Sequence, residues 1–595
     1  MRDEETSQPS TLDPRLQFTG PIQLTDTRRV PGPNLLWDRP GVVLDVTFPD
    51  DIAEPVIRAW QRAARRMLDA VEWRSEATTV RRFPGGATLA LSAPIDALLA
   101  ATEVNEWALD QAQAEVLGGS PLDFDAAARR LRDTIAAEER PRLIELWHAA
   151  RQHEVSCLVD EEVASVGSGT GSLHWPLEEI PPVASIDWSR VHDVATVLIT
   201  GSNGKTTSTR LLAAVLAQTG RVVGMCCTDS VTIGGMQIAA GDWAGPGGAR
   251  MVLRDTRVEM AVLETARGGI LRRGLAATRA SVAVVTNIAE DHFGEFGIHD
   301  LGALTATKLV VTRALDSSGV LVLNADDEML RQMAPDRGVN ICWFSLSDAN
   351  PVVQRHVAGG GRAVWVAKGE IRTGGFSEQG SLGSVGNIPI THQGSAGYNI
   401  ANALAVAAAA LSLGVTAVMV QRGLALFRGS SADNPGRLNL FEFGDTRVIA
   451  DFAHNPHGME ALVQMAQSLP ARRRLLVLGQ AGDRDDSAIR EFARSAWTFR
   501  PDRIVLKEME KYRRGRAVGE VPDILRDEFI RLGADPASVS SEPSEFDAVI
   551  ASLKWAQPGD LLLLPLHAER DRGLALLEEL RRSGWRAGED LAISY

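Results

Sequence analysis

Apolar runs alternate with helical repeats along most of the chain beyond residue 190. The runs that resemble strands cover residues 194–200, 222–228, 258–264, 281–287, 320–323 and 341–344. Between runs, apolar residues recur three or four positions apart, as Leu211, Leu212, Val215 and Leu216 do, which is typical of helices. Strands that alternate with helices predict an α/β fold with a doubly wound, mostly parallel sheet.

The same alternation returns near the end of the chain. Its strand-like runs cover residues 447–451, 474–478, 503–506 and 561–564. We therefore predict a central domain over residues 191–430 and a smaller, Rossmann-like α/β C-terminal domain over residues 431–595.

The first third of the chain has a mixed pattern. One clear strand covers residues 42–48, and helical spacing covers residues 57–71 and 124–137. Residues 26–160 are therefore predicted to form an α+β N-terminal domain.

Two stretches show little periodicity. Residues 161–190 are rich in Gly, Ser, Thr and Pro, a composition that predicts a linker. Residues 1–25 combine small, charged and proline residues, and we expect a flexible tail there.

Composition narrows the classes of partner. The 595 residues carry a formal net charge of −14 that is spread without a basic cluster, so neither nucleic acid nor an anionic membrane is expected as a partner. The four cysteines show no C-x-x-C spacing, which favours reduced thiols. With no signal segment and no run of eighteen apolar residues, we expect a soluble, cytoplasmic protein.

The most informative motif is a glycine loop between a predicted strand and a predicted helix. Residues 197–207 read VLITGSNGKTT. Glycines let backbone N–H groups approach phosphate oxygens, a lysine adds charge, and a threonine hydroxyl suits phosphate-bound Mg²⁺. The cofactors predicted are ATP and Mg²⁺, although Ile199 stands where the general Walker loop has its first glycine. The expected contacts are Gly201, Ser202, Asn203, Gly204, Lys205, Thr206 and Thr207.

Polar residues follow several of the predicted strands, where ligands of doubly wound sheets bind. Glu264 ends an apolar run and is our first choice as a Mg²⁺ ligand. His292 follows another run; it could bind a second ion or only form a hydrogen bond within a turn. Asn324 and Asp326 follow a third, and ordinary turn residues are the alternative there.

Seven motifs in this order resemble the Mur ligase family, ATP-dependent ligases that join a carboxylate to an amine. The resemblance covers residues 195–595. The motifs are TGSNGKTT (200–207), LET (263–265), TNI (286–288) with DH (291–292), NADD (324–327), GYNIAN (397–402), GR (436–437) and DFAHNP (451–456).

The resemblance implies roles for matching positions. Lys205 and Thr206 would hold the ATP phosphates and Mg²⁺, with Glu264 and His292 as metal ligands. Asn324, Asn402 and Arg437 would surround the nucleotide. Asp451, His454, Asn455 and Pro456 would face the nucleotide and the incoming amine. Many members carry a carbamylated lysine, for which Lys308 is the nearest candidate.

A closer resemblance links the chain to the ligase half of cyanophycin synthetases. It is carried by LETARGGILR (263–272), VLNADD (322–327), and Lys507-Glu508 with Arg514-Gly-Arg516, and in the first domain by GPN (32–34) and TEVNEW (102–107). Those enzymes have an ATP-grasp domain between the two parts, and here only the predicted linker separates them. Residues 242–246 lack the hydroxyls that relatives often have there.

The function predicted is an ATP-dependent ligase that forms an amide bond through an acyl phosphate, with a small amino acid and an acidic acceptor as its partners. Residues 428–436 have the composition of a hinge that would close the last domain over the site. A regulatory or scaffold protein without turnover and a plain ATPase are the alternatives. The N-terminal domain would recognise the acceptor or form contacts within a homo-oligomer.

Overall fold

The fold begins with an antiparallel sheet of four strands in the order β1-β2-β4-β3. The computed structural model describes residues 20–290, 293–334 and 338–591. The strands are β1 (Gln23–Val30), β2 (Gly41–Thr47), β3 (Thr78–Phe83) and β4 (Gly86–Ser92), and the helices that accompany them are α1 (Asp50–Ala70), α2 (Leu98–Leu117) and α3 (Phe124–Glu138).

Helix α1 illustrates how the core of this domain forms. Val56, Trp60, Ala64 and Met67 recur at helical spacing and are all buried, so one face of the helix packs into the core. The Trp60 indole N–H donates to the Asn105 Oδ1 on α2 at 2.9 Å, which satisfies both buried polar groups. The α+β N-terminal domain predicted from the sequence is confirmed.

The segment predicted as a linker contains ordered structure. Helix α4 (Pro141–Gln152) packs against a three-stranded antiparallel sheet of β5 (Cys157–Val159), β6 (Val163–Val166) and β7 (Leu173–Pro176). Buried apolar residues within the segment, among them Val166, Ile180 and Ile186, share a core with Leu146 on α4. Strands this short leave too little alternation to be read from the sequence, which explains the difference.

The central domain contains a sheet of eleven strands. Their order is β11-β10-β9-β12-β8-β13-β14-β15-β16-β17-β18, and the run from β9 to β16 is parallel. The bounds are β8 (Ala195–Thr200), β9 (Val223–Cys226), β10 (Ser230–Ile233), β11 (Met236–Ala240), β12 (Met260–Glu264), β13 (Ala280–Val285), β14 (Leu315–Asn324), β15 (Asn340–Ser345), β16 (Arg362–Ala367), β17 (Glu370–Gly374) and β18 (Gly380–Ser384).

Helices cover both faces of this sheet. Along β8, Val197 and Ile199 belong to one core and Leu198 to the other, because successive side chains of a strand point to opposite faces. The first core takes in α5 (Lys205–Ala217), α11 (Gly397–Ser412) and α12 (Ala417–Leu426). The second takes in α6 (Pro246–Arg254), α7 (Arg267–Arg273), α8 (Leu301–Lys308), α9 (Glu328–Met333) and α10 (Pro351–Ala358).

The C-terminal domain contains a second sheet, in the order β19-β20-β24-β21-β22-β23, in which only β19 is antiparallel. Its strands are β19 (Asn439–Phe443), β20 (Thr446–Asp451), β21 (Arg474–Leu478), β22 (Arg503–Lys507), β23 (Val539–Glu542) and β24 (Leu561–Pro565). Its helices are α13 (Pro456–Gln467), α14 (Asp486–Trp497), α15 (Glu520–Arg531), α16 (Glu545–Trp555) and α17 (Arg570–Ser583).

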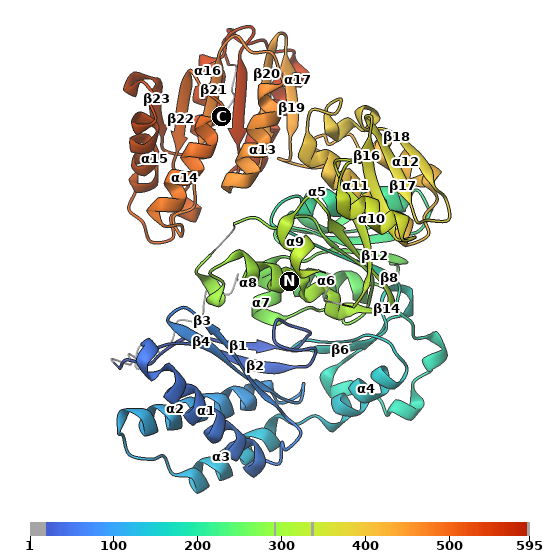
Figure 1. The fold of residues 1–595 in the computed structure, drawn as a ribbon, viewed down its shortest axis with the longest axis vertical. Helices are drawn as coiled ribbons and strands as arrows, with labels where there is room; N and C mark the ends of the chain where they lie inside the picture. Colours follow the sequence, from blue (N-terminus) through green and yellow to red (C-terminus); the bar gives the residue numbers. More distant parts are fainter. Residues whose placement is uncertain (1–19, 291–292, 335–337, 592–595) are drawn as a thin grey trace.

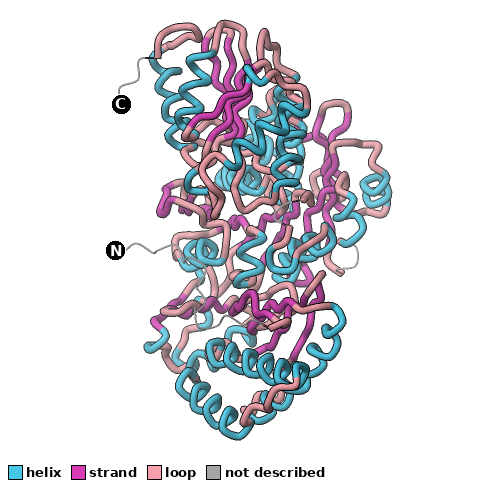
Figure 2. The backbone as a smooth tube through the Cα atoms, turned by 90° about the vertical axis from the view of Figure 1, so that its left-hand side faces the viewer, coloured by secondary structure: helices cyan, strands magenta, loops and turns pink. Residues whose placement is uncertain are grey.

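The domains lie one above another along the longest axis of the molecule (Figure 1). The N-terminal domain is at the bottom, the central sheet in the middle and the C-terminal domain at the top, and Figure 2 shows the same order from the side. Both predicted α/β domains are thus confirmed. Within the described residues, no helix is long and apolar enough to cross a membrane.

Candidate active site

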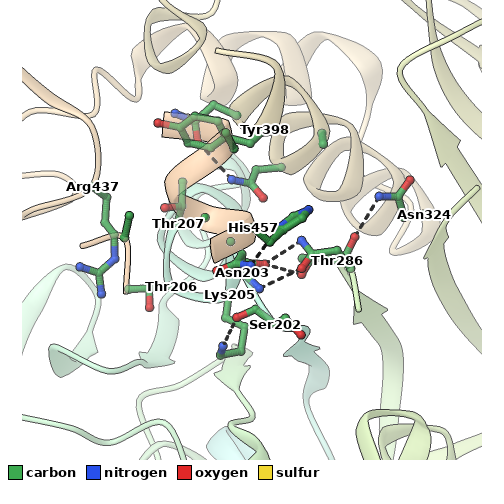
Figure 3. Close-up of a pocket in the computed structure, with 18 of the residues that line it drawn as sticks. Ser202, Asn203, Lys205, Thr206, Thr207, Thr286, Asn324, Tyr398, Arg437 and His457 are labelled. Atoms are coloured by element: carbon green, nitrogen blue, oxygen red, sulfur yellow. Dashed lines mark hydrogen bonds between the residues drawn. The ribbon is translucent and has the colours of Figure 1, made fainter. Parts of the chain in front are cut away.

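A cavity of about 380 Å³ lies where the central domain meets the C-terminal domain (Figure 3). The central domain lines it with the loop after β8, the ends of β12, β13 and β14, and the first turns of α11. The C-terminal domain contributes the end of β20 and the start of α13. Carboxyl ends of parallel strands therefore open into the cavity, where doubly wound folds bind ligands.

The glycine loop, residues 201–204, has two positions that only glycine fits. Gly201 and Gly204 have φ of 145° and 82°. A Cβ on Gly201 would lie 1.9 Å from the Thr286 hydroxyl, and one on Gly204 would lie 2.2 Å from the Asn402 Oδ1. Helix α5 begins directly after the loop, at Lys205, so its first N–H groups and dipole favour an anion there.

The Lys205 side chain folds back over this loop. Its Nζ donates to the carbonyl oxygens of Gly201 and Ser202, each at 3.0 Å. Those carbonyls are weak partners compared with a phosphate oxygen, since charge-assisted bonds between ions are stronger. The lysine is therefore already beside the position that a phosphate would occupy.

Residues at the end of β13 hold the loop in place. The Thr286 hydroxyl donates to the Asn203 carbonyl at 2.6 Å, and the Asn287 side chain bonds to both the N–H and the carbonyl of Asn203. The Asn324 amide donates to the Thr286 carbonyl at 3.1 Å. Thr286 and Asn287 were not among the predicted site residues, although their position after a strand was a usable signal.

Glu264 is buried at the end of β12, with 1% of its surface exposed. The Thr228 hydroxyl and N–H both donate to its carboxylate, at 2.8 and 3.1 Å, and the Thr206 hydroxyl lies 3.4 Å from that of Thr228. Burial raises the pKa of the Glu264 carboxyl, and the Lys205 charge opposes this rise. Thr228 was missed at the sequence level.

These groups form a set of oxygen ligands that fits Mg²⁺. One carboxylate and the Thr206 hydroxyl suit an ion that keeps several waters and takes its other ligands from phosphates. No cluster of three or more His, Cys, Asp or Glu side chains able to hold a metal occurs among the described residues. His292, predicted as a further ligand, lies outside the described residues, as does Asp291.

Two more predicted residues contact the glycine loop or the helix that follows it. The Asn402 Oδ1 accepts a hydrogen bond from the Ser208 hydroxyl at 3.4 Å. Lys308 is buried in the last turn of α8 and its Nζ donates to the Gly201 carbonyl at 2.8 Å. Lys308 therefore supports the base of the loop and does not line the cavity.

Arg437 and Asp451 approach the cavity from the C-terminal domain. The Arg437 guanidinium lies 4.1 Å from the centre of the Phe452 ring, a cation–π contact. The Asp451 carboxylate accepts the N–H groups of Leu438 and Ala453. Burial raises the pKa of Asp451, with Arg437 opposing it, and burial lowers the pKa of Arg437.

The start of α13 touches the glycine loop directly. The Asn455 amide donates to the Asn203 Oδ1 at 3.0 Å. The Asn203 amide faces the His457 Nδ1 at 3.0 Å (Figure 3). Asn455 also caps α13 by accepting the Gly458 N–H, and Pro456 is the first helical residue, where its missing N–H costs nothing. His457 was missed at the sequence level.

The structure thus brings most predicted site residues to one cavity. Those that line it are Ser202, Asn203, Gly204, Lys205, Thr206, Thr207, Glu264, Asn324, Asn402, Arg437, Asp451 and His454. Gly201, Lys308, Asn455 and Pro456 do not line it.

Comparison with protein families identifies the class. The Mur ligase middle domain model matches residues 199–410, and the Mur ligase glutamate ligase domain model matches residues 436–565. Together the two models match more than half of the chain, which therefore belongs to the Mur ligase family. The family consists of ATP-dependent ligases that join an acid to an amino acid.

Among curated proteins, the chain is similar to cyanophycin synthetases. It is 38% identical to that of Crocosphaera subtropica over 62% of this chain and 42% of the relative, and 40% identical to that of Synechocystis over 55% and 37%. The chain thus matches about two fifths of the length of these relatives. It is also 26% identical to a UDP-N-acetylmuramoyl-L-alanyl-D-glutamate–2,6-diaminopimelate ligase of Geobacter metallireducens, over 62% of this chain and 73% of that one.

Solved structures give matches of lower identity. Escherichia coli FolC in complex with DHPP and ADP matches at 20% identity with a TM-score of 0.47, over 65% of this chain and 89% of that one. MurF from Acinetobacter baumannii matches at 19% identity with a TM-score of 0.46, over 65% and 77%.

Proposed function

We propose that this chain is an ATP-dependent ligase that forms an amide bond between an acidic acceptor and an amino acid. The contact between Asn455 of the C-terminal domain and Asn203 of the glycine loop carries the proposal. It joins a phosphate-binding loop to the segment that, in the family resemblance, meets the amine. A plain ATPase needs no second domain at its phosphate loop.

The chemistry asks for groups that this cavity contains. A carboxylate is a poor electrophile, so a ligase first moves the γ-phosphoryl group onto it and the amine then displaces phosphate from the acyl phosphate. Two anions must approach each other in the first step, and fixed positive charge and N–H dipoles stabilise that approach. Lys205 and the start of α5 supply them here.

In this proposal the glycine loop binds the ATP phosphates, with Lys205, Thr206 and Thr207 as its charged and hydroxyl groups. Thr206, Glu264 and His292 would hold Mg²⁺, which would neutralise phosphate charge. The remaining nucleotide contacts would be Asn324, Asn402 and Arg437.

The amine would enter from the C-terminal domain. Asp451, His454 and Asn455 would position it, while Pro456 fixes the start of α13. Lys308 would hold the base of the glycine loop through its bond to the Gly201 carbonyl. This would be a role for the unmodified side chain of Lys308, in addition to the role it would have if it were carbamylated.

The acyl phosphate must be shielded from water, so the last domain would close over the site. The connection between the two domains suits this motion, because Gly429 and Gly436 both have φ of 65° and no helix or strand spans residues 428–436. Asn434, inside this hinge, donates to the Thr207 hydroxyl at 3.2 Å. A change in the position of the phosphate loop would therefore be transmitted to the hinge through this contact.

The N-terminal domain would recognise the acceptor. The Arg81 guanidinium donates to the carbonyls of Phe296 and Gly297, which follow the end of β13 by about ten residues. This places the N-terminal domain against the segment that leads away from the site. Homo-oligomer contacts would then use other surfaces.

The test measures ADP and phosphate release by the purified chain with amino acids and acidic peptides, singly and in pairs. A ligase requires both a carboxylate and an amine for release, and mass spectrometry should find the joined product. Release that needs neither substrate would identify an ATPase. No release with any pair, despite ATP binding, would identify a regulatory or scaffold protein on the same framework.

A further inference from the structure

Three ionisable side chains, the buried Lys507 and Glu545 and the half-buried His567, lie behind the 451–456 loop. Lys507 ends β22, Glu545 begins α16, and His567 follows β24. Lys507 has 0% and Glu545 1% of its side chain exposed. The proposed chemistry uses none of the three, and charges buried this deeply are expensive unless they are fully paired.

The pairing of this group is complete. The Lys507 Nζ donates to the Glu545 carboxylate at 2.5 Å, to the Pro565 carbonyl at 2.5 Å and to the His567 Nδ1 at 3.1 Å. An ammonium has three protons, and all three have acceptors. Burial alone would raise the pKa of the Glu545 carboxyl, but the Lys507 charge and the His567 N–H hold it at about 2.

Glu545 also fixes the chain that carries His567. Its carboxylate accepts the backbone N–H groups of His567, Ala568 and Glu569, at 2.7, 3.2 and 2.8 Å. The turn between β24 and α17 is therefore tied to the start of α16. Gly479, directly after β21, leaves room for the Lys507 side chain, since a Cβ there would lie 2.7 Å from the Lys507 Cγ.

The lysine determines the tautomer of His567. An ammonium can only donate, so the His567 Nδ1 must accept and the proton of the neutral ring must sit on Nε2. The Nε2 faces the Ala453 carbonyl at 3.1 Å, so it donates to that oxygen. The ring also packs edge-on against Phe452, with centroids 5.0 Å apart.

Ala453 is the middle of the loop that carries Asp451, His454 and Asn455. We propose that His567 is a positioning residue for amine binding: its Nε2–H, set by the Lys507–Glu545 pair, holds the Ala453 carbonyl and thereby aims this loop at the incoming amine. The inference rests on the proposed ligase function and adds a residue that never touches substrate.

Two substitutions by amide residues distinguish the contributions of the two ring nitrogens of His567. His567→Gln places an amide N–H near the Nε2 position and keeps a donor for Ala453, whereas His567→Asn keeps a polar group near the Nδ1 position and loses that donor. In the full chain, His567→Asn should raise KM for the amine about tenfold, the factor for one lost hydrogen bond, and leave KM for ATP within about twofold. His567→Gln should stay within about threefold of the unaltered chain for both.

Chemical rescue covers the case in which His567→Asn fails to fold. His567→Gly is purified with imidazole, which can accept from Lys507 and donate to Ala453, and compared with the same variant in 1-methylimidazole, which has no N–H to donate. Imidazole should lower KM for the amine more than 1-methylimidazole does.

The outcomes distinguish the two claims. If the unaltered chain shows no amine-dependent ADP release, the ligase function fails. If the unaltered chain is active and the Gln and Asn variants share one amine KM, or both imidazoles rescue equally, the positioning role of His567 is wrong and the ligase function stands.

Discussion

The Arg570 guanidinium of the C-terminal domain forms an ion pair with the Asp229 carboxylate of the central domain at 2.5 Å. Arg210 and Arg437 lie 3.5 and 4.0 Å from the same carboxylate, which has only 5% of its side chain exposed. Burial alone would raise the pKa of Asp229, but the nearby arginines hold it below its usual value. One carboxylate thus links the central domain to the C-terminal domain.

The Asp229–Arg570 pair should couple domain closure to turnover. Asp229→Asn removes the ion pair while keeping the side-chain size, and Arg570→Gln removes it with a shorter, neutral side chain. Each should lower kcat/KM because closure becomes less favourable. Measured as a double-mutant cycle on kcat/KM, the coupling should be about 1–3 kcal/mol. Strictly additive effects would show that the pair does not hold the closed form.

Arg437 should act mainly in the closed form. It follows the hinge and stacks on Phe452, so it reaches the nucleotide only when the last domain is in place. Arg437→Ala should therefore lower kcat about tenfold or more while the Kd of ATP changes much less. Arg437→Lys keeps the charge without the planar stacking group and serves as the matched control. Equal losses in kcat and ATP affinity would contradict this role.

Glu264 should set the requirement for Mg²⁺. Glu264→Gln keeps the shape and can still accept from Thr228, but it removes the carboxylate charge. The Mg²⁺ concentration for half-maximal ADP release should rise about tenfold or more, and a chelator should abolish release by the unaltered chain. Glu259→Gln, on the surface at the start of the same strand, should leave the Mg²⁺ titration unchanged. An unchanged titration for Glu264→Gln would remove it from the metal site.

The group of Lys507, Glu545 and His567 should make the free energy of unfolding depend on pH. Burial and Lys507 keep the pKa of His567 well below its ordinary 6.5, so the unfolded chain binds a proton there first and stability falls as the pH drops below 6.5. The pKa of Glu545 is about 2 against an ordinary 4.5, so its stabilisation is complete above pH 4.5 and is lost between pH 4.5 and 2.

Urea unfolding of the C-terminal domain between pH 8 and 4 measures the first of these effects. In His567→Gln, the free energy of unfolding should no longer decline below pH 6.5. The decline that Glu545 causes at lower pH should remain. Its matched control is His174→Gln, at an exposed histidine of the small sheet next to the N-terminal domain. If the free energy of unfolding of His567→Gln still declined below pH 6.5, another titratable group would be its cause.

Most of the fold could be predicted from the sequence, because the central strands of the two α/β sheets are buried on both faces. Strands such as Met260–Glu264 are buried throughout and apolar up to their last residue, so they stand out between helical repeats. The edge strands escaped prediction because exposed, short segments such as Met236–Ala240 leave no apolar run. Val163–Val166, within the expected linker, is mostly buried, but its four residues are too few to show a clear alternation.

The residues of the candidate site likewise include some that could be predicted from the sequence and some that could not. Lys205 and Glu264 could be predicted because each sits in a local pattern of glycines or at the end of a strand. Asp229 and Arg570 could not, since 341 residues separate them and no local motif marks either. The role of His567 likewise depends on its contacts with Lys507 and Ala453, which are distant in the sequence. Contacts between domains follow from the folded packing, and a single sequence does not reveal them.

The most direct test of the account is ADP formation by Lys205→Ala with ATP, Mg²⁺ and a working pair of acid and amine. Loss of this charge should lower the rate about a hundredfold or more, because nothing else in the glycine loop can neutralise phosphate charge. Lys554→Ala, at an exposed lysine of α16, serves as the matched control and should keep the full rate. If Lys205→Ala forms ADP as fast as the unaltered chain, the glycine loop is not where ATP reacts.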